Sequence, residues 1–88
     1  MYKVQLTQGA ADFIRGQTKK VQRQITGKLR RLKDDPRPPD CKKITGAENI
    51  YRLRSGVYRN VYQVFDDRVL VIVIRMGHRK DVYRRLIE

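Results

Sequence analysis

The chain has 88 residues, a formal net charge of +12 and a sequence pI near 10.5. This length predicts one domain, residues 1–88, that is too small for a large cofactor cleft, so we expect no cofactor. No apolar run reaches the roughly 18 residues that a membrane span needs. The single cysteine, Cys41, cannot form an internal disulfide, which fits the reducing cytoplasm.

The excess of 21 Lys and Arg over 9 Asp and Glu predicts a polyanionic partner. Nucleic acid comes first, because neutralising phosphates releases counterions. An anionic membrane surface or an acidic protein is also compatible with this charge.

The N-terminal half predicts one strand and two helices. Residues 1–6 alternate between apolar and polar side chains, as a half-buried strand does. Thr7 and Thr18 are suited to cap the helices that follow them. The second helix carries a stripe of Val21, Ile25, Leu29 and Leu32 at helical spacing, and its other sides are rich in basic residues. The prolines of Asp34 to Asp40 end it.

The C-terminal half predicts three strands joined by short turns. They cover roughly residues 49–55, 57–65 and 69–75, with turn signals at Ser55-Gly56 and Asp66-Asp67. The run VLVIVI, residues 69–74, is apolar throughout and predicts a central strand covered on both faces. Gly77 permits a tight turn, and a short helix over about residues 80–86 closes the chain. The fold is therefore expected to be α+β, in the order β-α-α-β-β-β-(α), with an antiparallel sheet and both N-terminal helices on one face.

Alternation along the strands separates the side chains that meet the helices from those that face away. Tyr51 and Leu53 are expected to meet the helices, whereas Arg52 and Arg54 point to the open face. A hairpin at Ser55-Gly56 would bring Arg54 and Arg59 together across two strands. Like charges opposite each other are destabilising, so such a concentration of guanidinium groups suggests a bound anion. Arginines that splay into water are the simpler alternative.

The order and spacing of several short motifs carry a resemblance. Within IYRLRSGVYRNVYQVFDDRVLVIVIRMGHRKDVYRRL, the pattern is YRxR, then YRxxYxxxD, an apolar strand, and a shortened GxRxxVY. The chain resembles the RelE/ParE superfamily, and more closely its RelE branch, over nearly its whole length. The resemblance implies a microbial-RNase-like fold and the toxin of a type II toxin–antitoxin system. It also implies a metal-independent endoribonuclease that cuts mRNA in the ribosomal A site, by attack of a 2′-hydroxyl that leaves a 2′,3′-cyclic phosphate.

The resemblance also assigns roles to individual residues. Arg59 matches the arginine that stabilises transition-state charge, and Arg79 the arginine near the leaving oxygen. Tyr83 matches the tyrosine that orients or stacks on the substrate. Arg52 occupies one of two positions where the family carries catalytic lysines, and Ile50 occupies the other. Further RNA contacts are expected from basic residues outside this set: Arg54, Lys19, Lys20, Arg23, Lys28, Arg30, Arg31 and Lys80.

The missing lysine pair leaves the general base open, because arginine in practice cannot lose its proton. His78, with an unperturbed pKa of about 6.5, could serve. Tyr83 could serve if surrounding arginines lower its pKa. Otherwise the ribosomal RNA supplies the group.

Two other functions fit the same sequence. One is a ParE-like gyrase inhibitor, which would not need Arg59, Arg79 and Tyr83 together. The other is a non-catalytic RNA-binding module whose arginines give only salt-dependent affinity. If the chain is a nuclease toxin, its partners are the ribosome, mRNA and a RelB-like antitoxin that presents acidic residues and a helix.

Overall fold

A computed structural model describes residues 1–78 and contains two helices and five strands. In chain order these are β1 (Lys3–Leu6), α1 (Gln8–Arg15), α2 (Lys19–Asp34), β2 (Lys42–Lys43), β3 (Ile50–Ser55), β4 (Tyr58–Phe65) and β5 (Leu70–His78), with a short 3-10 turn, Asp66–Arg68, before β5. The expected α+β class is confirmed. The expected C-terminal helix lies outside the described residues.

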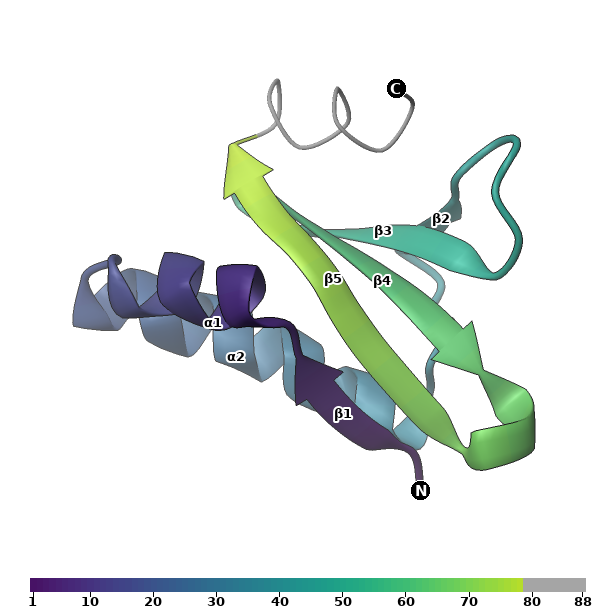
Figure 1. Cartoon of the computed structure of the whole chain (residues 1–88). Helices are drawn as coiled ribbons and strands as arrows, with labels where there is room; N and C mark the ends of the chain where they lie inside the picture. The colour runs from purple at the N-terminus through teal and green to yellow at the C-terminus, as the bar shows by residue number, and fades with distance from the viewer. Residues whose placement is uncertain (79–88) are drawn as a thin grey trace.

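The strands form one sheet in the order β1-β5-β4-β3-β2 (Figure 1). Strands β3, β4 and β5 form the expected antiparallel meander. The expectation of a wholly antiparallel sheet was wrong in one respect, because β1 runs parallel to β5. Both helices follow β1 before the chain returns through the meander, so the sheet is mixed. The short strand β2 at the opposite edge was not predicted.

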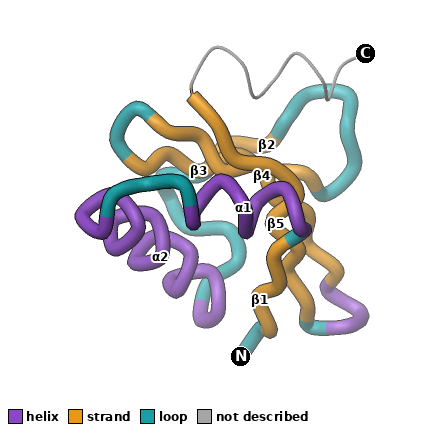
Figure 2. Tube along the Cα trace, turned by 60° about the vertical axis from the view of Figure 1, so that its left-hand side comes forward, coloured by secondary structure: helices purple, strands orange, loops and turns teal. Residues whose placement is uncertain are grey.

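The two helices pack on one face of the sheet, as expected (Figures 1 and 2). Each begins at the predicted threonine, whose hydroxyl accepts a hydrogen bond from the backbone N–H three residues later. Ile25, Leu29 and Leu32 of the predicted stripe are buried against Leu53 and the central strands. Burying this stripe holds α2 in place even though Gly27 lowers its intrinsic helix propensity.

The β3–β4 hairpin turns through Gly56 and Val57. Gly56 has a φ of +64°, and Ser55 pairs with Tyr58 on either side of the turn. A glycine at the first central position is what a type II′ turn requires, and this turn matches the twist of the flanking strands. The tight turn fixes the register of β3 against β4, so that Arg54 pairs directly with Arg59, as the sequence predicts.

Strand β5 contains a β-bulge at Ile74. Tyr62 of β4 pairs with Val73, but the preceding residue, Val61, pairs with Arg75, so Ile74 has no direct partner. The bulge reverses the alternation: Val71 and Val73 face the helices before it, and Met76 faces them after it. The carbonyl of Ile74 accepts a hydrogen bond of 2.8 Å from the Thr7 hydroxyl, which ties the bulge to the start of α1.

Two expectations about β5 need correction. The strand continues to His78, so Gly77 lies inside it, opposite Arg59, and does not form the expected turn. The apolar run is also less completely covered than expected. Val71 and Val73 are buried by the helices, but Leu70, Ile72 and Ile74 are only half-buried.

A polar network holds the end of the sheet farthest from the β3–β4 turn. The Arg37 guanidinium donates two hydrogen bonds to the Asp66 carboxylate, at 3.1 and 2.8 Å, and a third to the Tyr51 hydroxyl at 2.7 Å. The Tyr2 hydroxyl donates to the same carboxylate at 2.7 Å. The proline loop, the 3-10 turn and the N-terminus are thereby joined. Arg37, and then Tyr2, hold the pKa of Asp66 below its usual range.

This network predicts a pH-dependent contribution to stability. A carboxylate whose pKa is lower in the folded state stabilises the protein above the unfolded pKa of about 3.9, and the contribution is lost as pH falls through the folded value. We expect Asp66→Asn to lower the urea midpoint at pH 7, with the difference from wild type vanishing in strong acid. Asp67→Asn is the matched control, because Asp67 makes no hydrogen bond or ion pair with residues 1–78. A constant difference from pH 7 to pH 2 would contradict this role.

Candidate functional site

The face of the sheet away from the helices carries a cluster of cations at the end near the β3–β4 turn. Arg54 and Arg59 stand side by side on β3 and β4, and Gly77 continues their row on β5. The next row along the strands consists of Lys42, Arg52, Val61 and Arg75, one from each of β2 to β5. We call Lys42, Arg52, Arg54, Arg59 and Arg75 the basic cluster.

Two members of the basic cluster were not recognised in the sequence. Strict alternation through the apolar run would place Arg75 with Val71 and Val73, facing the helices. The bulge at Ile74 moves it to the open face, opposite Val61. Lys42 was missed because the two-residue strand β2 has no periodicity to detect. Its pairing with Arg52 places both side chains on the same face.

Arg59 is the most enclosed cation of the cluster. Only 8% of the surface of Arg59 is exposed to solvent. One terminal nitrogen donates long hydrogen bonds of 3.5 Å to the carbonyls of Gly56 and Tyr58, and the buried Nε has no hydrogen-bond partner among the described residues. Leaving a buried donor of a charged group unpaired is costly, so Arg59 is poised to bind an anion.

Acidic side chains are absent from the strands that the structure describes. Within residues 1–78, Arg54, Arg59 and Arg75 form no ion pair. Arg54, Arg59 and Arg75 therefore stand on neighbouring strands with no carboxylate from residues 1–78 paired with them. Such an arrangement produces a locally strong positive potential, which suits a polyanion such as the nucleic-acid backbone.

His78 lies on the other face of the sheet from the basic cluster. It pairs with Tyr58, and the rings of these two residues meet edge to face with centroids 5.9 Å apart. Tyr58 in turn packs against Phe13 of α1, which marks this side as the helix side. The structure thus places His78 beside Tyr58 on the helix side and does not bring its ring together with Arg59.

The basic residues of α2 lie in the helix layer, on the side of the sheet away from the basic cluster. Lys28 and Arg31 share the carboxylate of Asp40, at 2.8 and 3.5 Å. The others of the expected set are exposed: Lys19, Lys20, Arg23 and Arg30. Among residues 1–78, the RNA contacts expected from the sequence therefore lie on two faces. Arg54 belongs to the basic cluster, and the others are on α2. Arg79, Lys80 and Tyr83 lie outside the described residues.

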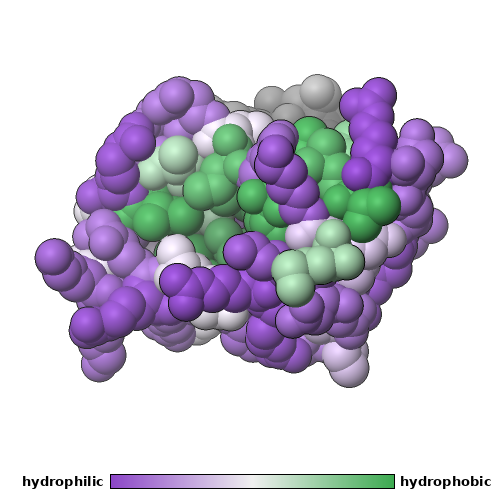
Figure 3. All heavy atoms as spheres, turned by 90° about the horizontal axis from the view of Figure 1, so that it is seen from below, coloured by the Kyte–Doolittle hydropathy of each residue, from purple (hydrophilic) through white to green (hydrophobic). Residues whose placement is uncertain are grey.

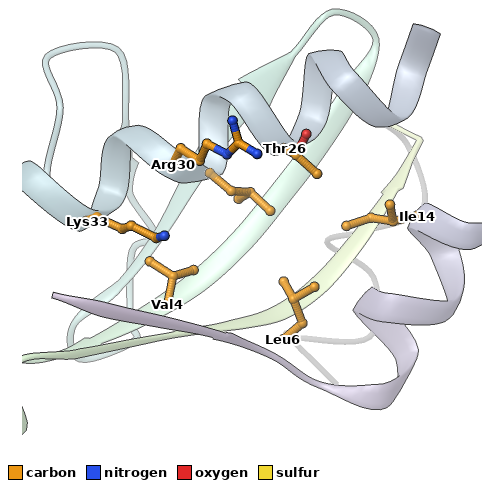
Figure 4. A pocket seen from close by; sticks show the side chains of 7 residues that line it. Val4, Leu6, Ile14, Thr26, Arg30 and Lys33 are labelled. Atoms are coloured by element: carbon orange, nitrogen blue, oxygen red, sulfur yellow. The ribbon is translucent and has the colours of Figure 1, made fainter. Parts of the chain in front are cut away.

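An apolar groove opens on the helix side, between β1 and the two helices. Its volume is about 170 Å³, and Val4, Leu6, Ile14 and Leu29 supply its apolar lining (Figure 4). Arg30 and Lys33 stand at its rim with Thr26. Figure 3 shows an apolar area framed by hydrophilic side chains on the face seen from below. Leu6, in the lining of the groove, is 40% exposed, so apolar surface of the groove is open to a partner.

Within residues 1–78, no helix is long and apolar enough to cross a membrane. These residues also contain no group of three or more His, Cys, Asp or Glu side chains placed to hold a metal ion.

Comparison with known proteins decides the family. The family described as "ParE toxin of type II toxin-antitoxin system, parDE" matches residues 5–83. The mRNA interferase toxin RelE of Escherichia coli K12 is 38% identical over 72 residues, which cover 77% of this chain and 75% of that protein. The chain belongs to the RelE/ParE toxin superfamily, in its RelE-like branch. The resemblance seen in the sequence is confirmed.

Solved structures of RelE proteins agree with the fold. RelE in the intact E. coli RelBE toxin–antitoxin complex superposes with a TM-score of 0.77 at 34% identity, covering 89% of this chain and 96% of that one. RelE in the archaeal RelE–RelB complex from Pyrococcus horikoshii gives a TM-score of 0.81 at 22% identity, covering 91% and 97%. The archaeal match shows the RelE fold alone.

The unpaired Nε of Arg59 predicts an effect on stability. A methionine of similar length would fill the same space without a buried charge, so we expect Arg59→Met to unfold at the same temperature as wild type or higher. Added inorganic phosphate should raise the wild-type midpoint more than that of the variant, because ligand that binds only the folded state stabilises it. Arg54→Met, on the exposed neighbour, is the control and should change stability by about 0.5 kcal/mol or less. A marked destabilisation by Arg59→Met would show that the guanidinium is a structural group.

Proposed function

We propose that this chain is a ribosome-dependent mRNA interferase, the nuclease toxin of a type II toxin–antitoxin pair. The observation that carries the proposal is the basic cluster around the enclosed Arg59, on the open face of a RelE fold. Sequence similarity to an mRNA interferase toxin, at 38% identity over most of the chain, supports the same activity. A substrate with closely spaced phosphates is the natural occupant of such a surface.

The proposed reaction is a transesterification within the mRNA. The 2′-hydroxyl oxygen attacks the adjacent phosphorus, and the bond from that phosphorus to the 5′-oxygen of the next nucleotide breaks. One proton leaves the 2′-hydroxyl and another reaches the departing oxygen, so the products are a 2′,3′-cyclic phosphate and a 5′-hydroxyl. Negative charge grows on the phosphorane oxygens between these events.

Guanidinium groups supply the positive charge that the transition state needs. Arg59 is held in a shielded position, where an electrostatic contact is stronger than in water. Arg52 and Arg54 stand across from β4 and can share the remaining oxygens. We propose that these arginines take the place that a metal ion fills in other nucleases. Arg79, two residues beyond Gly77 in the sequence, is proposed to stabilise the leaving oxygen.

The general base is proposed to be Tyr83 or a group of the ribosome. His78 is the poorer candidate, because its ring lies beside Tyr58 on the helix side while Arg59 lies on the open face. Arg84 and Arg85 follow Tyr83 in the sequence, and positive charge near a phenol favours its ionised form. The family role of Tyr83 in orienting the substrate is compatible with this assignment.

Cleavage of mRNA on translating ribosomes tests the proposal. We expect Arg59→Ala and Arg79→Ala each to slow cutting by about 100-fold or more, the usual cost of losing an electrostatic donor in the transition state. His78→Ala should cut nearly as fast as wild type, whereas Tyr83→Phe should be slow. The product end should be a 2′,3′-cyclic phosphate. Cutting at the wild-type rate by both arginine variants would refute the site, and loss of cutting in His78→Ala would refute the choice of base.

Gyrase inhibition is the second candidate, because the matching family is described by its ParE members. A supercoiling assay with purified gyrase separates the two activities. Inhibition of gyrase without any mRNA cleavage would overturn the nuclease proposal. The concentration of arginines on the open face favours the nuclease.

The partner is proposed to be an antitoxin that occupies the apolar groove. RelE proteins with this fold are found in complexes with the antitoxin RelB. Leu6 and Ile14 of the groove can contact an apolar stripe of the antitoxin. Arg30 and Lys33 at the rim can pair with acidic residues beside that stripe. An amphipathic helix with acidic flanks has both features.

The groove proposal predicts a selective loss of affinity. Leu6→Glu should weaken binding of the antitoxin by tenfold or more, because it places a carboxylate against an apolar contact. Val57→Glu, at an apolar residue of similar exposure in the β3–β4 turn, should bind as wild type does. Calorimetric titration with the product of a short reading frame beside the gene would measure both. Equal affinities for the two variants would place the antitoxin elsewhere.

A further inference from the structure

The basic cluster is wider than one phosphate. Neighbouring strands lie about 4.8 Å apart, so the row from Lys42 to Arg75 crosses roughly 14 Å of sheet. Hydrogen bonds from a cation to a phosphate oxygen are only about 2.7–2.9 Å long. A single phosphate over Arg52 and Arg59 therefore leaves the two ends of the row for other groups.

The ends of the row are placed on the open face by specific structural features. Arg75 is turned there by the bulge at Ile74, whose carbonyl is fixed by the Thr7 hydroxyl. Lys42 is placed there by its pairing with Arg52, on the edge strand β2. The central arginines lie between them. At the centre, the enclosed Arg59 has an Nε without a hydrogen-bond partner among residues 1–78, which leaves this donor for an anion.

We propose that Arg75 and Lys42 bind the backbone phosphates on either side of the scissile phosphate. The mRNA would then cross the strands, from β2 to β5, with its reactive phosphate over the central arginines. This inference rests on the proposed nuclease function and adds the direction of the RNA and two residues that hold it. Arg75 and Lys42 contact phosphates that do not react, so their loss should weaken substrate binding far more than the chemical step.

The chain offers a matched control for each residue. Lys43 is adjacent to Lys42 and equally basic, but it pairs with Tyr51, whose side chain packs on the helix side. Arg15 of α1 carries the same charge as Arg75 and is exposed in the helix layer. Each control removes one positive charge without touching the open face. General loss of net charge is thereby separated from loss of a phosphate contact.

Salt-dependent binding of a single-stranded RNA tests the contacts directly. The probe is an oligoribonucleotide with every 2′-hydroxyl methylated, which cannot be cut. We expect Lys42→Gln and Arg75→Gln each to reduce the slope of log K against log salt by about 0.7, the value for one phosphate contact on a single strand. Lys43→Gln and Arg15→Gln should keep the wild-type slope. The inference would be overturned if each variant had the same slope as its control: Lys42→Gln the same as Lys43→Gln, and Arg75→Gln the same as Arg15→Gln.

Kinetics on translating ribosomes separates this inference from the proposed function. Lys42→Gln and Arg75→Gln should raise KM severalfold and change kcat little, whereas Arg59→Ala should lower kcat. If wild type cuts mRNA but Lys42→Gln and Arg75→Gln match their controls in both assays, the flanking contacts are wrong and the nuclease stands. If wild type never cuts mRNA but the slopes change as expected, the nuclease proposal fails and the phosphate contacts stand.

Discussion

One extra residue in a central strand determines which side chains share the open face. The bulge at Ile74 interrupts the pairing of β4 with β5 and reverses the alternation beyond it. Before the bulge, Val71 and Val73 pack in the core, and after it Met76 packs there. Arg75 therefore joins the arginines of β3 and β4, and Gly77 lies next to Arg59 with no side chain to cover it. His78 is turned towards the helices for the same reason.

Thr7 couples this bulge to the helical layer. Its hydroxyl donates to the Ile74 carbonyl and accepts from the backbone N–H of Ala10, so one side chain serves both the bulge and the start of α1. A hydroxyl can fill both roles at once because it is a donor and an acceptor. The bulge that places Arg75 in the basic cluster is thus hydrogen-bonded to the residue that begins α1.

The concentration of cations is a cost to the folded chain. Like charges on adjacent strands repel each other, and the buried Nε of Arg59 has lost water without gaining a partner among the described residues. The rest of the structure offsets this with an ordinary core of Ile25, Leu53 and Tyr62, and with the Arg37–Asp66 network at the far end of the sheet. Unsatisfied groups that persist in a stable fold are characteristic of binding and catalytic sites.

Local patterns predicted most of the fold and the pairing of two arginines within the basic cluster. The caps at Thr7 and Thr18, the stripe of α2 and the adjacency of Arg54 and Arg59 all depend on residues close in sequence. The parallel pairing of β1 with β5 could not be predicted, because it joins segments more than 60 residues apart. The bulge could not be predicted either, because the apolar run shows no break at Ile74 and the Thr7 hydroxyl that bonds its carbonyl is 67 residues away in the sequence. Arg75 was missed for that reason, and Lys42 because two consecutive lysines carry no strand signal.

The apolar groove and the basic cluster lie on opposite faces of the same sheet. A partner that only fills the groove would leave the arginines accessible to a polyanion. To shield both faces, a binding protein must be longer than one helix and must pass around an edge of the sheet. Strand β1 forms the edge beside the groove, and its outer side carries no neighbouring strand among the described residues. The sheet itself therefore sets a minimum length on any single chain that could both hold this protein and silence its charged face.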